Sequence, residues 1–140
     1  MKSFVKTCAM VLLLINATGA LFGGANLIIH PDGGSMKLSM EWLRYTPFDN
    51  YLIPGIILVI ANGVFSVAAF VAAYFKVGRY PLYFFAQGAI LTGWIVIQIL
   101  LIRTIIGLHF VMGGIGILLM ICGWLLRSKE AGKQANVIKL

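Results

Sequence analysis

The sequence has little charge, and most of that charge has one sign. Among its 140 residues are 4 acidic and 11 basic side chains, whereas 61% of the residues are hydrophobic. So small a polar fraction cannot cover the core of a water-soluble domain. The composition therefore excludes a soluble globular protein and predicts an integral membrane protein, with a single domain over residues 1–140.

Cysteine and histidine are also scarce. Cys8 and Cys122 both lie near predicted cytoplasmic ends of membrane spans, so no disulfide framework is expected. His30 and His109 belong to no ligand pattern such as HxxxH or HExxH. They also differ in predicted depth, which makes them a poor pair of axial haem ligands. We therefore expect no enzyme activity, no catalytic residue, no metal and no cofactor.

What the sequence does contain is four apolar runs of membrane-spanning length. A hydrocarbon core of about 30 Å needs roughly 20 helical residues. The predicted spans are residues 4–29, 51–75, 82–102 and 105–126, with an outer loop at 30–50 and a cytoplasmic tail at 127–140 that we expect to be frayed. The first run begins like a signal peptide, but it continues past Ala20 to Ile29 and is interpreted as a span. The predicted fold class is an all-α membrane protein, an up-down-up-down bundle of four transmembrane helices with a structured outer loop between the first two.

The basic residues are unevenly distributed between the ends of these spans. If successive spans alternate in direction, eight basic residues fall on the side of both termini, and three (Lys37, Arg44 and Arg103) fall on the other. This positive-inside bias predicts a multi-pass protein of the cell inner membrane with both termini cytoplasmic. Because topology accounts for the basic charge, nucleic acid is not an expected partner.

Each span carries small and polar residues at helical spacing, which in lipid marks the face that contacts other helices. These rows are Asn16, Gly19, Gly23, Asn26 and His30; Gly55, Asn62, Ser66, Ala69 and Ala73; Gln87, Leu91, Trp94 and Gln98; and His109, Gly113, Gly116, Met120 and Gly123. Asn16 and Asn62 are predicted to meet at mid-membrane as an amide pair bridging the first two helices. Such a bond contributes about 0.6–2 kcal/mol.

The other polar residues concentrate near the outer surface. The candidate outer-leaflet pocket consists of Asn26, His30, Trp94, Gln98 and His109, and the loop above it carries Asp32, Glu41, Trp42, Arg44 and Asp49. Within the loop we expect a short interfacial helix over 40–45 rather than a strand, since a lone strand leaves backbone donors unpaired. One alternative to plain hydrogen bonding is a metal or acid–base site formed by His30, Asp32, Glu41, Asp49 and His109. Another is a conduit lined by Gln87, Trp94 and Gln98, in place of helix packing.

The run TPFDNYLIPGIILVIANG, followed later by GWIVIQI, resembles a widespread group of small bacterial four-helix membrane proteins that has no assigned activity. The resemblance implies the fold and brings no function. The expected function is a non-catalytic integral membrane module, a small subunit or stabilising partner in a membrane assembly. Its expected partners are the lipid bilayer and a larger membrane protein, or a second copy bound through glycine-rich helix faces. The alternative is a small-solute or lipid-handling protein that uses the outer-leaflet pocket.

Overall fold

The computed structural model describes residues 2–33, 43–44, 46–102 and 107–139, and at 2, 101–102, 108 and 129–139 it describes the backbone alone. Every regular element in these ranges is a helix: α1 (Lys2–Ile29), α2 (Leu52–Leu58), η3 (Val59–Val64), α3 (Phe65–Tyr74), α4 (Tyr80–Ile102) and α5 (Gly107–Lys139). Four stretches are long and apolar enough to cross a membrane: Ser3–Ile29, Leu52–Tyr74, Tyr80–Leu100 and His109–Ser128. The prediction of an all-helical, multi-pass membrane protein is confirmed at this level.

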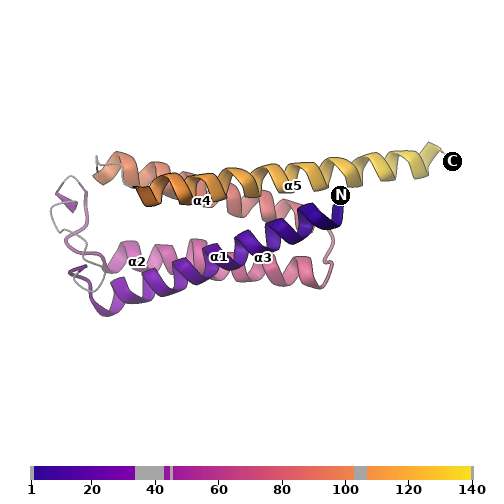
Figure 1. The fold of residues 1–140 in the computed structure, drawn as a ribbon. Coiled ribbons are helices and arrows are strands. Elements are labelled where there is room, and N and C mark those ends of the chain that lie inside the picture. The colour runs from indigo at the N-terminus through magenta and orange to yellow at the C-terminus, as the bar shows by residue number, and fades with distance from the viewer. Residues whose placement is uncertain (1, 34–42, 45, 103–106, 140) are drawn as a thin grey trace.

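Helix packing begins with α1 lying along the continuous helix 52–74, which comprises α2, η3 and α3 (Figure 1). A methyl group added at Gly24 would collide with Val59 and would lie 2.9 Å from the carbonyl oxygen of Gly55. A methyl group added at Gly63 would likewise lie 2.7 Å from the Leu21 Cδ2. Gly24 lies beside Gly55, and Leu21 lies beside Gly63. Residue numbers thus rise along one helix as they fall along the other, so the two helices are antiparallel. Glycine allows this close backbone approach.

α4 and α5 form the second closely packed pair. A methyl group at Gly88 would lie 2.5 Å from the carbonyl oxygen of Gly116, and one at Gly123 would lie 2.6 Å from the carbonyl oxygen of Pro81. These contacts are with backbone atoms, which cannot move aside as the end of a flexible side chain can. The α4–α5 interface therefore depends on glycine at three positions, and it too runs antiparallel.

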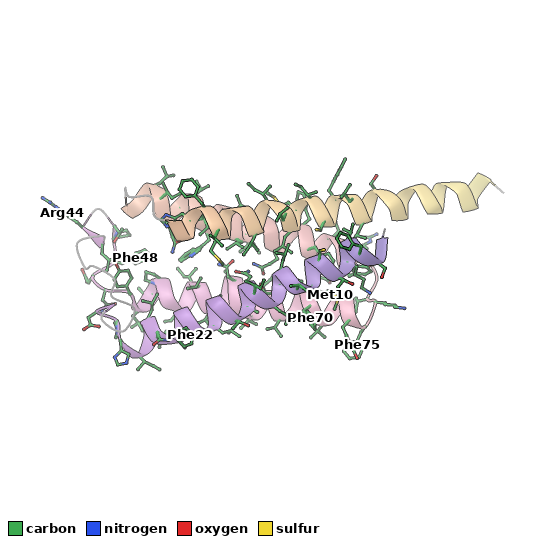
Figure 2. The ribbon with its side chains drawn as sticks, in the orientation of Figure 1. Met10, Phe22, Arg44, Phe48, Phe70 and Phe75 are labelled. Carbon is green, nitrogen blue, oxygen red and sulfur yellow. The ribbon has the colours of Figure 1, made fainter. Side chains whose placement is uncertain are left out.

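A common apolar core joins the two pairs. Leu13 of α1, Ala69 of α3, Phe84 of α4 and Leu119 of α5 are all fully buried in one cluster. Large apolar side chains also cover the outside of the helices. Figure 2 shows Phe22 among them, 69% exposed on α1. In a membrane this outer apolar surface faces lipid acyl chains or another protein.

The connection from α3 to α4 is a tight turn with two residues in the left-handed region. Lys76 has φ 54° and Arg79 has φ 65°. The Lys76 N–H donates to the Ala73 carbonyl over 3.2 Å and the Val77 N–H donates to the Ala72 carbonyl over 2.9 Å. These two bonds form a Schellman motif, which commonly has glycine where this chain has Lys76.

The described ends of the 30–50 loop pack on the helices. Leu43 and Tyr51 are buried against Leu27 of α1, and the Tyr51 N–H donates to the Pro31 carbonyl over 2.8 Å. Arg44 projects away from the helices (Figure 2). Of the predicted short helix over 40–45, positions 40–42 and 45 lie outside the described residues.

The expectation of a frayed tail after residue 126 is wrong. α5 continues as a helix to Lys139 and extends beyond the other helices (Figure 1). The segment RSKEAGKQANVIK contains no proline, and 8 of its 13 residues are the good helix formers Lys, Ala, Arg, Glu and Gln. It can therefore propagate a helix that the membrane span has already nucleated.

The expectation that Gly19 lies on the interior face of α1 is also wrong. Gly19 is exposed, and a methyl group there would have no atom within 4 Å. Gly24, which the sequence pattern did not single out, makes the close contact instead. Where α1 crosses the second span at Gly55 and Val59, it is the face of α1 carrying Gly24 that makes the contact, and the face carrying Gly19 does not.

Candidate functional site

Four neutral polar side chains lie together among the apolar residues at the centre of the helices. Asn16 comes from α1, Asn62 from η3, Ser66 from α3 and Gln87 from α4, and each is fully buried. We call these four residues the central polar cluster. Buried polar groups within a membrane have to find partners in the protein, because lipid offers none.

Hydrogen bonds connect the central polar cluster across three spans. The Asn16 Nδ2 donates to the Ser66 Oγ over 2.8 Å and lies 3.4 Å from the carbonyl oxygen of Asn62. The Gln87 Nε2 donates to the Asn62 Oδ1 over 3.1 Å. The helix 52–74 thus stands between α1 and α4 and is bonded to both.

The cluster coincides with a change of helical winding. Residues Val59–Val64 form a π-helical turn, and the Phe65 N–H donates to the Ile60 carbonyl, five residues earlier. Asn62 and Gly63 of this turn are both buried. A π-helical turn inside an α-helix is rare and is frequently found at functional sites. The coincidence of the π turn with the buried amides makes the central polar cluster the candidate site.

Several atoms of the cluster are left without a partner. Asn16 Oδ1, Asn62 Nδ2 and Gln87 Oε1 find no hydrogen-bond partner among the residues that the structure describes. A buried polar group left unpaired costs about 1–3 kcal/mol. Thr92 Oγ1 is a fourth such atom, but it lies against Gly116 in the α4–α5 interface. The three unpaired amide atoms therefore mark the cluster as a place with unused hydrogen-bonding capacity.

The chemistry available to the cluster is recognition rather than proton transfer. Amide and hydroxyl groups donate and accept hydrogen bonds, but they do not ionise near neutral pH. The cluster can therefore orient helices or hold a small polar molecule. Nothing in it resembles an activated nucleophile or a general base.

The predicted mid-membrane pair is part of this cluster. The structure brings Asn16 and Asn62 together through the carbonyl oxygen of Asn62, while the Asn62 side chain turns to Gln87. Ser66 and Gln87 were on the predicted interior rows, but the sequence did not show that they belong to the same site. The signal available was their position, since both are polar residues deep within apolar runs.

The predicted outer-leaflet residues are spread over three helices. Asn26 is half-buried, and its Nδ2 donates to the Phe22 carbonyl of its own helix over 2.8 Å. His30 is exposed beyond the end of α1. Trp94 packs against the main apolar core. Gln98 is half-buried on α4 and His109 is buried on α5.

The predicted loop residues are described only in part. Asp32, Arg44 and Asp49 are exposed, whereas Glu41 and Trp42 lie outside the described residues. Among the side chains that the structure describes, no three from His, Cys, Asp or Glu lie close enough to hold a metal ion.

An apolar groove lies between α1 and α5, at the end of the molecule where α1 begins. It has a volume of about 480 Å³ and includes Cys8 and Cys122, which are both free thiols. Its other lining residues are Phe4, Val5, Thr7, Val11, Leu12, Leu118 and Leu125. The groove is at the opposite end of α1 from Asn26, so it is distinct from the predicted outer-leaflet pocket.

Comparison of the chain with protein families, curated proteins and solved structures finds no match.

Proposed function

We propose that the protein is a non-catalytic membrane module, a small subunit or stabilising partner in a membrane assembly. In this proposal the four helices cross the inner membrane up-down-up-down, with the 30–50 loop outside and both termini in the cytoplasm. The antiparallel packing within each helix pair is consistent with this path. The excess of basic residues on the side of the termini supports the orientation.

Three small residues that are exposed on the outside of α1 carry the proposal. Thr18, Gly19 and Ala25 are all exposed on this helix, and Gly19 has open space where a side chain would begin. Lipid gives apolar helices no hydrophobic reason to associate, so small residues that allow close backbone approach mark contact faces. Gly24, Gly55 and the α4–α5 glycines are already used within the chain. Gly19 is available to a second chain.

The buried polar groups support a non-catalytic role. The Asn16–Ser66 and Gln87–Asn62 bonds join helices of the same chain, so the amides stabilise its packing. In this proposal the buried polar contacts hold the helices of one chain together, and the exposed small residues contact another chain.

The test is native mass spectrometry of the protein extracted from its membranes in mild detergent. We expect a complex of fixed stoichiometry, with a larger protein or with a second copy, that Gly19→Leu disrupts. Ala68→Leu is the matched control, because Ala68 is a small exposed residue on α3. A wild-type protein that is monomeric in gentle extraction, or a complex that is equally insensitive to both substitutions, would contradict the proposal.

A second candidate function is the handling of a small solute or lipid at the outer leaflet. The observation in its favour is His109, an ionisable residue that begins the fourth candidate membrane span and is only 5% exposed. Intramembrane ionisable residues commonly mark ligand or ion pathways. If this function holds, lipid or solute should co-purify with the wild-type protein in stoichiometric amount, and His109→Leu should abolish its retention.

A further inference from the structure

The unpaired atoms of the central polar cluster have a definite hydrogen-bonding character. Asn16 Oδ1 and Gln87 Oε1 are acceptors, and Asn62 Nδ2 is a donor. The cluster could therefore accept two more hydrogen bonds and donate one more.

This character does not depend on how the amides are oriented. Turning both amides of the Asn62–Gln87 pair end for end exchanges their roles, but one donor and one acceptor remain unpaired. Asn16 has no such freedom, because its Nδ2 faces the carbonyl oxygen of Asn62, which can only accept. Two acceptors and one donor thus remain in either arrangement.

We propose that α1, η3 and α4 bind one water molecule at the centre of the membrane. A water molecule donates two hydrogen bonds and accepts one or two, which matches the three unpaired atoms. Buried waters in proteins make about three hydrogen bonds to polar groups that otherwise lack partners. The water donates to Asn16 Oδ1 and Gln87 Oε1 and accepts from Asn62 Nδ2.

The position of the site gives the water a structural consequence. It bridges Asn16 of α1 and Gln87 of α4, which the direct bonds connect only through the helix 52–74. The three spans then meet at one bound molecule. This binding site is buried, whereas Gly19, the residue tested for the proposed assembly, is exposed. A failed test of the water site would therefore not refute the assembly, and a failed test of the assembly would not refute the water site.

Water-edited solid-state NMR of the uniformly ¹⁵N-labelled full chain in lipid bilayers tests the proposal. The measured quantity is the transfer of magnetisation from water protons to the Asn62 side-chain NH₂. In the wild type we expect this transfer to exceed clearly the transfer to the backbone amides of Leu13 and Leu91, which lie in the dry core. Asn16→Leu removes one of the three hydrogen bonds and should lower the transfer to Asn62 by about threefold to tenfold.

Asn26→Leu is the matched control, because it removes an asparagine of the same helix whose amide donates to Phe22 instead. It should leave the Asn62 signal unchanged. The proposal is overturned if the wild-type Asn62 NH₂ is as dry as Leu13 and Leu91, or if a folded Asn16→Leu protein retains full transfer. The wild-type measurement decides the question even where the variant does not fold.

Discussion

Gln87 on α4 donates a hydrogen bond from its Nε2 to the Oδ1 of Asn62 in the π-helical turn, over 3.1 Å and with both side chains fully buried. The bond ties the antiparallel pair formed by α1 and 52–74 to the pair formed by α4 and α5. Because both side chains are fully buried, paired substitutions can test the bond.

Gln87→Leu and Asn62→Leu should each lower the thermal stability of the protein in detergent. Membrane hydrogen bonds contribute about 0.6–2 kcal/mol, and neighbours that share one interaction are not additive. The double variant should therefore lose less free energy of unfolding than the sum of the single variants. Gln98→Leu, on a half-buried residue of the same helix, should show no coupling to Asn62→Leu. Strict additivity of Gln87 and Asn62 would refute the bond.

Gly88→Ala should destabilise the α4–α5 interface by about 1–3 kcal/mol, the range for overpacking. The added methyl group would meet the Gly116 carbonyl oxygen at 2.5 Å and the Met120 backbone nitrogen at 2.7 Å. Gly93→Ala on the same helix meets nothing within 4 Å and should be neutral or slightly stabilising. Thermal unfolding of the two variants side by side measures the difference. Equal stabilities would show that the helices do not approach so closely.

Lys76→Gly should keep or raise stability, whereas Lys76→Val should lower it. The left-handed conformation at φ 54° costs an ordinary residue roughly 1–2 kcal/mol and costs a β-branched residue more, while glycine adopts it freely. Denaturation in detergent gives the order Gly, Lys, Val. A valine variant as stable as the glycine variant would place Lys76 outside the left-handed region.

Cys8 and Cys122 should be joined by a short bifunctional maleimide, because both line the groove between α1 and α5. Mass spectrometry of the digested protein should find the α1 and α5 peptides linked within one chain. Cys8→Ser provides the control that must abolish the link. Two separate single adducts in the wild type would mean that the ends of these helices lie apart.

The proposed orientation predicts opposite labelling of two exposed positions. In a background with both natural cysteines replaced by serine, Asp49→Cys should react with an impermeant thiol reagent in whole cells. Gly78→Cys, in the turn between α3 and α4, should react only after the membrane is opened. The basis is the positive-inside distribution of basic residues. The reverse pattern would invert the proposed topology.

The helical spans could be predicted because apolar length is a strong signal. The second span was expected at 51–75, and the corresponding stretch in the structure is Leu52–Tyr74. Its interior row also follows from spacing, since Gly55, Asn62, Ser66, Ala69 and Ala73 are all buried. Polar and small residues are uncommon enough in such runs that their alignment carries information.

The connections within the central polar cluster could not be predicted. A period of 3.6 residues places Asn62 and Ser66 on one face, but it contains no sign of the π-helical turn at Val59–Val64. Which atom of Asn62 meets which neighbour depends on that local winding. The glycines of the first span could not be assigned for a similar reason. Glycines at helical spacing mark a possible close approach, but they do not show which face of the helix the partner crosses, and the contact is made by Gly24 and not by Gly19.

The length of α5 changes what its C-terminal end can do. Residues 129–139 continue the helix past its membrane-spanning part, which ends at Ser128. At about 1.5 Å per residue they reach roughly 16 Å further. A flexible tail would let a bound protein sample many distances from the bilayer, but a helical spacer fixes both the distance and the direction. Anything attached to Lys139 would therefore be presented at a set height, with a high effective concentration for targets at that height and a low one for targets at the lipid surface.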